Sequence, residues 1–115
     1  MKGILEEKSF QFSLQIIDLY KYITEEIKEF VISKQVLRSG TSIGANIAEA
    51  KFAQSKADFL SKMSISLKEA NETRYWLRLL EASYMSENSI ITPVMNACND
   101  LLNMLVATCK TTKSI

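Results

Sequence analysis

The stretch LRSGTSIGANIAEA, residues 37–50, places two glycines inside a segment that otherwise has the composition of a helix. A glycine within a helix costs roughly 1 kcal/mol relative to alanine, so Gly40 and Gly44 need a compensating contact. Together with Ala48 they form a row of small residues spaced four apart on one helix face. Such a row lets a second helix backbone approach closely, and the resulting dispersion attraction can offset the glycine cost. We therefore predict close helix packing at Gly40, Gly44 and Ala48; the alternative is an irregular turn at Gly40 that splits the helix.

The composition indicates an all-α protein. The chain has 115 residues, which fits one domain over residues 1–115, and its 47% apolar and 23% charged residues are ordinary for a globular protein. One proline and three glycines are too few for an all-β chain, which needs frequent turn residues. No apolar run approaches the ~20 residues that a bilayer requires, and the first residues do not resemble a signal peptide. We expect a cytoplasmic protein without membrane contact.

The residues that could carry chemistry do not form a recognisable site. In the quoted stretch Gly44 is followed by Ala-Asn, where a phosphate-binding loop has Lys-Ser or Lys-Thr. Histidine is absent, and Cys98 and Cys109 lie about 16 Å apart along one helix, too far for a disulfide or a shared zinc ion. Three carboxylates stand at spacings common on any solvated helix: Glu49, Glu69 and Glu72. We therefore predict no enzyme activity, no catalytic residues, no cofactor and no metal ion.

Apolar residues recur at helical spacing in four segments: about Lys8–Ile32, about Ser33–Phe52, from Ser55 onward and from Thr92 onward. The apolar stripe of the first segment extends through Phe30 and Val31. The opening of this stripe, FQFSLQI at residues 10–16, also alternates with period two like a strand. Because the stripe continues for several further turns, we interpret the segment as a helix and the alternation as coincidence.

Capping residues mark the start of the last two helices. Ser55 is suited to the N-cap position of the third, and Asp58 three residues later supplies a negative charge in its first turn. Thr92 is the expected N-cap of the fourth, with Pro93 at its first helical position. Short connections make consecutive helices antiparallel neighbours, so the predicted architecture is an up-down-up-down four-helix bundle.

The third helix carries a second stripe beside its core stripe, formed by Ile65, Glu69, Glu72, Trp76 and Leu79. One interpretation is that this stripe widens the core toward a neighbouring helix. The other is a subunit interface centred on Ile65, Trp76 and Leu79, because aromatic residues are enriched at interface centres. The antiparallel register of the second and third helices also places Arg38 opposite Glu69, so we predict an ion pair between them.

Lys51, Lys56 and Lys62 gather near the connection between the second and third helices and are the candidate nucleic-acid contacts. The net charge of +1 is far from the basic balance of most nucleic-acid-binding domains, and such a cluster is more often only solvated. Tyr and Phe side chains are expected to belong mostly to the helix stripes, so no aromatic platform interleaved with basic residues is predicted.

The segment from Ser33 to Leu80 resembles the bacterial four-helix bundle proteins named for 23S rRNA intervening sequences. Its most specific pieces are LRSGTSIGANIAEA, SKADF and LKEANETRYWL, and the resemblance extends more loosely to the first and last helices. The resemblance implies a homo-oligomer of up-down bundles, and the number of subunits that it favours is five (a pentamer). It also implies kinship with the accessory protein of diversity-generating retroelements, which partners a reverse transcriptase and binds nucleic acid.

Two functions remain open at this point. One is a homo-oligomeric adaptor that associates with RNA or a nucleoprotein. The other is a structural oligomer or a module that binds a protein partner without touching nucleic acid.

Overall fold

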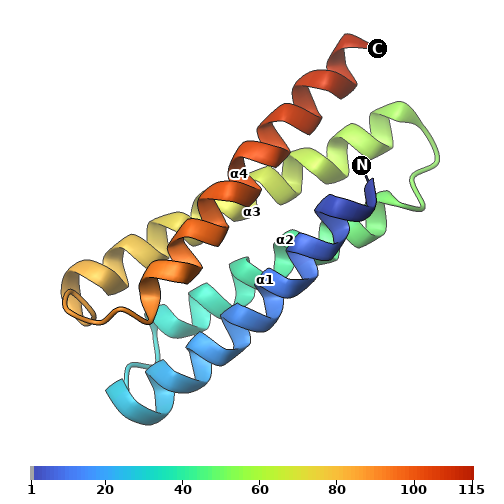
Figure 1. Cartoon of the computed structure of the whole chain (residues 1–115). Helices are drawn as coiled ribbons and strands as arrows, with labels where there is room; N and C mark the ends of the chain where they lie inside the picture. The colour runs from blue at the N-terminus through green and yellow to red at the C-terminus, as the bar shows by residue number, and fades with distance from the viewer. Residues whose placement is uncertain (1) are drawn as a thin grey trace.

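The computed structural model describes residues 2–115, which form four long helices and one short π-helix. In chain order these are α1 (Lys2–Tyr22), the π-helix η1 (Ile23–Ile27), α2 (Ile32–Ala50), α3 (Lys56–Ser83) and α4 (Ile91–Ser114). Each long helix runs antiparallel to the next, in a rod of 46 × 20 × 19 Å (Figure 1). The predicted all-α, up-down-up-down bundle is confirmed, and the described residues contain no strand. Within the same range, no helix has the length and apolar character needed to span a bilayer.

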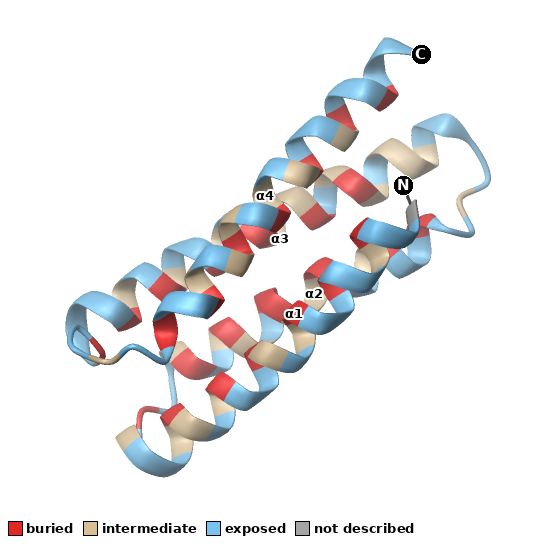
Figure 2. Cartoon of the chain, viewed as in Figure 1, coloured by how far each residue is buried: buried red, intermediate tan, exposed pale blue. Residues whose placement is uncertain are grey.

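The core lies between the four inner helix faces, where buried positions repeat at helical spacing (Figure 2). Burying each large apolar side chain contributes about 1.5–3 kcal/mol. The largest fully buried side chains come from all four helices: Phe12, Ile16 and Leu19 of α1, Ile43 of α2, Leu77 and Leu80 of α3, and Ile91, Leu101 and Leu105 of α4. Every buried side-chain nitrogen or oxygen of the described residues has a hydrogen-bond partner.

Gly40 and Gly44 lie within the uninterrupted helix α2 and face α1. A Cβ atom on Gly40 would come within 2.7 Å of Cγ1 of Ile16, and one on Gly44 within 3.3 Å of the Ser9 carbonyl oxygen. The irregular turn that we considered at Gly40 does not occur, because α2 continues through it. Ala48, the third member of the small-residue row, is exposed.

The first helix ends earlier than the stripe of apolar residues predicts. It passes into η1, and Lys28 then adopts a left-handed conformation with φ 62° that breaks the helix. Phe30 and Val31, which we assigned to the apolar stripe, are exposed in the turn between η1 and α2. The carboxylate of Glu29 accepts hydrogen bonds from the first backbone N–H groups of α2 and so begins a new helix. Because this side-chain cap comes from a glutamate, it lacks the usual N-cap signature.

The two predicted caps have different outcomes. Ser55 caps α3 as predicted: its side chain accepts a hydrogen bond from the Asp58 N–H at 3.0 Å. Thr92 is not the N-cap of α4, because that helix begins one residue earlier at Ile91. Pro93 is consequently its third residue, which is tolerated because N–H groups of a first turn have no acceptor within the helix.

Candidate functional site

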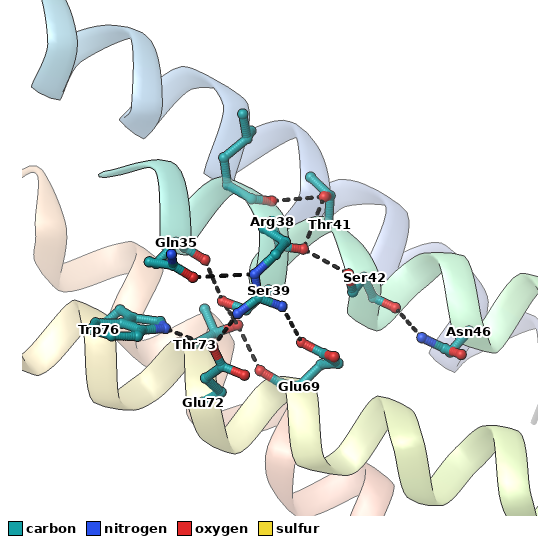
Figure 3. Close-up of polar contacts among 11 residues, drawn as sticks. Gln35, Arg38, Ser39, Thr41, Ser42, Asn46, Glu69, Glu72, Thr73 and Trp76 are labelled. Atoms are coloured by element: carbon teal, nitrogen blue, oxygen red, sulfur yellow. Dashed lines mark hydrogen bonds and ion pairs between the residues drawn. The ribbon is translucent and has the colours of Figure 1, made fainter. Parts of the chain in front are cut away.

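A polar network links α2 to α3 on the outer surface of the bundle (Figure 3). The Arg38 guanidinium lies 3.4 Å from Oε1 of Glu69 and also forms an ion pair with Glu72. Oε2 of Glu72 accepts a second hydrogen bond, from Nε1 of Trp76, at 2.9 Å. The predicted pair of Arg38 and Glu69 is confirmed, whereas the role of Glu72 was missed. Glu72 stands close to one turn beyond Glu69, within reach of the same long side chain.

Small polar residues beneath this network hold α2 and α3 together. The Thr73 hydroxyl donates to Oγ of Ser39 at 2.9 Å, and the Ser66 hydroxyl donates to the carbonyl oxygen of Ile43 at 2.8 Å. All three hydroxyl residues are fully buried. These bonds join α2 to α3 in the same register that places Arg38 beside its two glutamates.

The network of Arg38, Glu69, Glu72 and Trp76 is expected to contribute little to the free energy of unfolding. In double-mutant cycles that combine Arg38→Met with Glu72→Gln or Glu69→Gln, we expect coupling energies of about 0–1 kcal/mol. The reason is exposure: 48% of the Arg38 side chain is open to solvent. Both coupling energies, obtained from urea denaturation, should shrink at ~1 M salt because of screening. A coupling well above about 1 kcal/mol for either pair at low salt would contradict this expectation.

The proposed interface residues of α3 are only partly available for contact. Ile65 is exposed, while Trp76 and Leu79 are half-buried. Trp76 also packs edge-on against Tyr75, with ring centroids 5.3 Å apart. Its indole donates to Glu72, so this ring is already held within the chain. A subunit contact at these three residues stays a prediction.

A longer exposed apolar stripe lies on α1, where the sequence pattern did not lead us to expect one. It consists of Phe10, Leu14 and Ile17, spaced four and three residues apart, and Phe10 is 59% exposed. The feature of the sequence that could have indicated this stripe is the period-two alternation of residues 10–16. On a helix, residues two apart point in nearly opposite directions, so Phe12 and Ile16 enter the core while Phe10 and Leu14 face outward. The prediction of a helix is confirmed. The alternation, which we interpreted as coincidence, places apolar side chains on two opposite sides of α1.

Two of the three candidate nucleic-acid contacts are paired with carboxylates. Nζ of Lys51 lies 3.0 Å from Oε2 of Glu6 on α1, and Nζ of Lys62 lies 2.9 Å from Oε1 of Glu49 on α2. The hydrogen bond with Glu49 raises the pKa of Lys62. Lys56 is exposed at the start of α3. We did not assign these lysines to carboxylates of adjacent helices from the sequence, as we did for Arg38 and Glu69. Contact of this cluster with nucleic acid stays a prediction.

Aromatic side chains are more exposed than expected. We assigned the Tyr and Phe residues mostly to the helix stripes, but five of the nine are exposed: Phe10, Phe30, Phe52, Tyr75 and Tyr84. This correction matters most on α3, where Tyr75 lies directly after Arg74 and three residues before Arg78. An exposed aromatic ring is therefore interleaved with basic residues on this helix.

A groove of about 460 Å³ opens between α1 and α4 at the end of the bundle that holds both chain termini. Apolar side chains dominate its lining, among them Phe59, Met63 and Met104. The charged residues at this groove, Glu6 and Lys51, are paired with each other. The described lining of the groove includes no other charged side chain.

The comparisons with known proteins agree with the observed fold. Residues 3–107 match the family described as 23S rRNA-intervening sequence protein. The chain is also similar to the crystal structure of a protein of unknown function from the S23 ribosomal protein family of Bacteroides thetaiotaomicron. The two are 48% identical with a TM-score of 0.90, over 96% of this chain and 99% of that chain. The comparison with curated proteins found no match. With a match over nearly its whole length, the chain belongs to the 23S rRNA-intervening sequence protein family.

Proposed function

We propose that this chain is a non-enzymatic helical bundle that assembles with copies of itself and acts as an adaptor on RNA or a nucleoprotein. The observation that carries the proposal is the family match over residues 3–107. The family name refers to insertions in 23S rRNA genes, which by itself describes a location rather than an activity. A relationship to the accessory protein of diversity-generating retroelements stays a prediction.

Exposed apolar side chains support self-association. Phe10, Leu14 and Ile17 form one stripe on α1, and Ile65 is exposed on α3. In the up-down arrangement α1 and α3 are diagonal neighbours, so their outer faces point away from each other (Figure 1). Two different faces on opposite sides suit a head-to-tail contact, which closes into a ring when the rotation permits. The number five rests on the family resemblance alone.

Assembly would also strengthen RNA binding. A single chain with a net charge of +1 offers few phosphate contacts, and affinity from phosphates rises with the number neutralised. A ring repeats each basic group several times on one rigid body. Multivalency can then raise the overall affinity by ~10²-fold or more, provided that one strand can span the sites. The expected binding is sensitive to salt and tolerant of sequence.

Light scattering on the purified protein tests the assembly. We expect a mass several times the 13.0 kDa of one chain at micromolar concentration. Leu14→Glu should shift the mass toward 13.0 kDa, because it buries a charge in the proposed contact. Lys8→Glu, an exposed charge change on a different face of α1, is the matched control and should leave the mass unchanged. A monomeric wild-type protein would contradict the proposal.

The RNA part is tested by recovering the protein from its own cells and sequencing the RNA that co-purifies. Co-purification of RNA of varied sequence, lost after a wash at high salt, is the expected result. The second candidate function, a structural oligomer or protein-binding module without RNA, is favoured by the pairing of Lys51 and Lys62 with carboxylates. An oligomer that carries no RNA would contradict the adaptor function and support this second function.

A further inference from the structure

The three cations of α3 that follow Lys62 have no acidic partner among the described residues, in contrast to Lys51 and Lys62. Lys68, Arg74 and Arg78 are all exposed, and within the described residues none of them lies within ion-pair distance of a carboxylate. The hydrogen bond that Arg74 makes within α3, to Oδ1 of Asn71, is long at 3.4 Å. Tyr75 lies among these cations and is 55% exposed. The guanidinium groups, and the part of the Tyr75 ring that does not pack against Trp76, are therefore open to another molecule.

The neighbouring helix α4 continues this surface. Its outward residues toward α3 recur every three or four positions and include no Asp or Glu: Asn96, Asn99, Asn103, Val106, Lys110 and Lys113. Neither lysine of this set has a carboxylate within ion-pair distance among the described residues. The acidic residue of α4, Asp100, shares its helix face with Met104 and Thr111, which line the groove toward α1. The name α3–α4 cationic face is used below for six residues: Lys68, Arg74, Tyr75, Arg78, Lys110 and Lys113.

Contacts between the two helices show which side of α3 adjoins α4. Sγ of Cys98 lies 3.5 Å from the carbonyl oxygen of Ala70, and Sγ of Cys109 lies 4.0 Å from Oγ of Ser64. Burial raises the pKa of the Cys98 thiol to about 12, and the nearby charge of Arg74 opposes that rise. Arg74 therefore lies on the side of α3 that adjoins α4.

The face is long enough for several nucleotides. In the observed antiparallel register, Lys113 of α4 lies beside the region of Leu60 in α3. Leu60 and Arg78 are 18 residues apart along α3, which corresponds to about 27 Å at 1.5 Å per residue. The exposed Glu81, three residues beyond Arg78, ends the run of cations. Non-specific single-strand sites typically take ~4–16 nucleotides, so a run of this length suits a short segment of an extended strand.

We propose that the α3–α4 cationic face is the surface on which single-stranded RNA lies. Arg74 and Arg78 hold phosphates with their planar donor groups, Lys68 and the α4 lysines add point charges, and Tyr75 stacks on a base. The proposal rests on the RNA association proposed above and assigns it to a surface. Charge complementarity favours this face over the cluster at Lys51 and Lys62, since those two lysines would first have to leave Glu6 and Glu49.

Two triple variants with the same loss of charge test the assignment. One is Lys68→Gln with Arg74→Gln and Arg78→Gln, and the other is Lys51→Gln with Lys56→Gln and Lys62→Gln. Each is titrated against a labelled single-stranded RNA at ~50 and ~150 mM salt, with light scattering as a check on assembly. We expect the α3 variant to bind at least ~10-fold more weakly, with a salt slope lower by about 2 for three lost contacts. The lysine-cluster variant should stay within about threefold of wild type.

A single substitution tests the aromatic contribution separately from charge. Tyr75→Leu leaves an apolar side chain at this position but removes the aromatic ring that stacks on a base. We therefore expect the affinity for RNA to fall about fivefold or more, without a change in salt slope. Tyr84→Leu is the matched control, because Tyr84 is equally exposed but lies beyond the end of α3. Its affinity should remain that of the wild type.

Four results would overturn the assignment. Equal weakening by the two triple variants would mean that only net charge matters, and unchanged binding by the α3 variant would place RNA elsewhere while leaving the proposed function intact. No binding by the wild-type oligomer would overturn the proposed RNA association and this assignment together. An acidic protein partner that needs Arg74 and Arg78, in an oligomer without RNA, would likewise overturn both.

Discussion

Replacing Gly40 with leucine is expected to lower the free energy of unfolding by about 3 kcal/mol. A Cβ atom at this position already meets Cγ1 of Ile16 at 2.7 Å, and Ile16 is completely buried. The added side chain must therefore displace core residues of α1 or push α2 away. Gly44→Leu should lower the free energy of unfolding by less, about 1–3 kcal/mol. A Cβ atom there would lie 3.3 Å from Ser9 and Ser13, which is a less severe contact than the one at Gly40.

Ala48→Leu is the control within the same row of small residues. Ala48 is exposed, so the substitution should change the free energy of unfolding by less than about 0.5 kcal/mol. Urea denaturation of the three variants and the wild type, at one protein concentration, measures the order. If Gly44→Leu or Gly40→Leu proved neutral, the close approach of α1 and α2 would not be what the two glycines provide.

Removing the Glu29 carboxylate is expected to cause the other large loss of stability. Glu29 is buried and accepts hydrogen bonds from the backbone N–H groups of Val31, Ile32 and Ser33 at 2.8–3.0 Å. Glu29→Ala leaves these donors without the partner that begins α2, so we expect a loss of about 2 kcal/mol. Glu26→Ala, an exposed glutamate of η1, is the control and should cost less than about 0.5 kcal/mol.

Acidic pH should have the same effect on the wild type as the substitution. Burial raises the pKa of Glu29, but the backbone hydrogen bonds lower it more, and the pKa is below its ordinary value of 4.5. A carboxyl group with a lowered pKa in the folded state stabilises fully above its unfolded-state pKa. This contribution is lost as the pH falls through the folded-state pKa.

Denaturation midpoints of wild type and Glu29→Gln measured from pH 7 down to pH 3 check the sign. The wild type should lose its advantage over the variant below about pH 4.5, because protonation removes the same charge. A difference between the two proteins that stayed constant over this range would show that the carboxylate charge of Glu29 does not stabilise α2.

Interactions between near neighbours in the chain could be predicted well. Ser55 and Asp58 are three residues apart, so the cap that joins them depends only on one turn of helix. The glycine row also predicted close packing on one side of α2, although not that Ile16 would be the side chain in contact. The turn at Lys28 escaped prediction because the apolar pattern continues through it. Phe30 and Val31 keep that spacing while lying outside the core.

The candidate site was predicted less completely, since its contacts join helices. An antiparallel register sufficed to pair Arg38 with Glu69, but a register alone cannot say how far a long side chain reaches, and Glu72 was missed. The three lysines of the cluster lie near one connection in the chain, but two of them are paired with carboxylates. Their pairing with Glu6 and Glu49 depends on which faces of α1 and α2 adjoin them.

The sequence by itself determined the helical fold, the antiparallel order of the helices and the position of the small-residue row, because helical periodicity and short connections are local properties. The tertiary structure decided which charges remain free. A lysine and a glutamate distant in the chain neutralise each other only when packing brings their helices together. Lys51 is therefore paired with Glu6, while Arg74 and Arg78 have no carboxylate within ion-pair distance among the described residues.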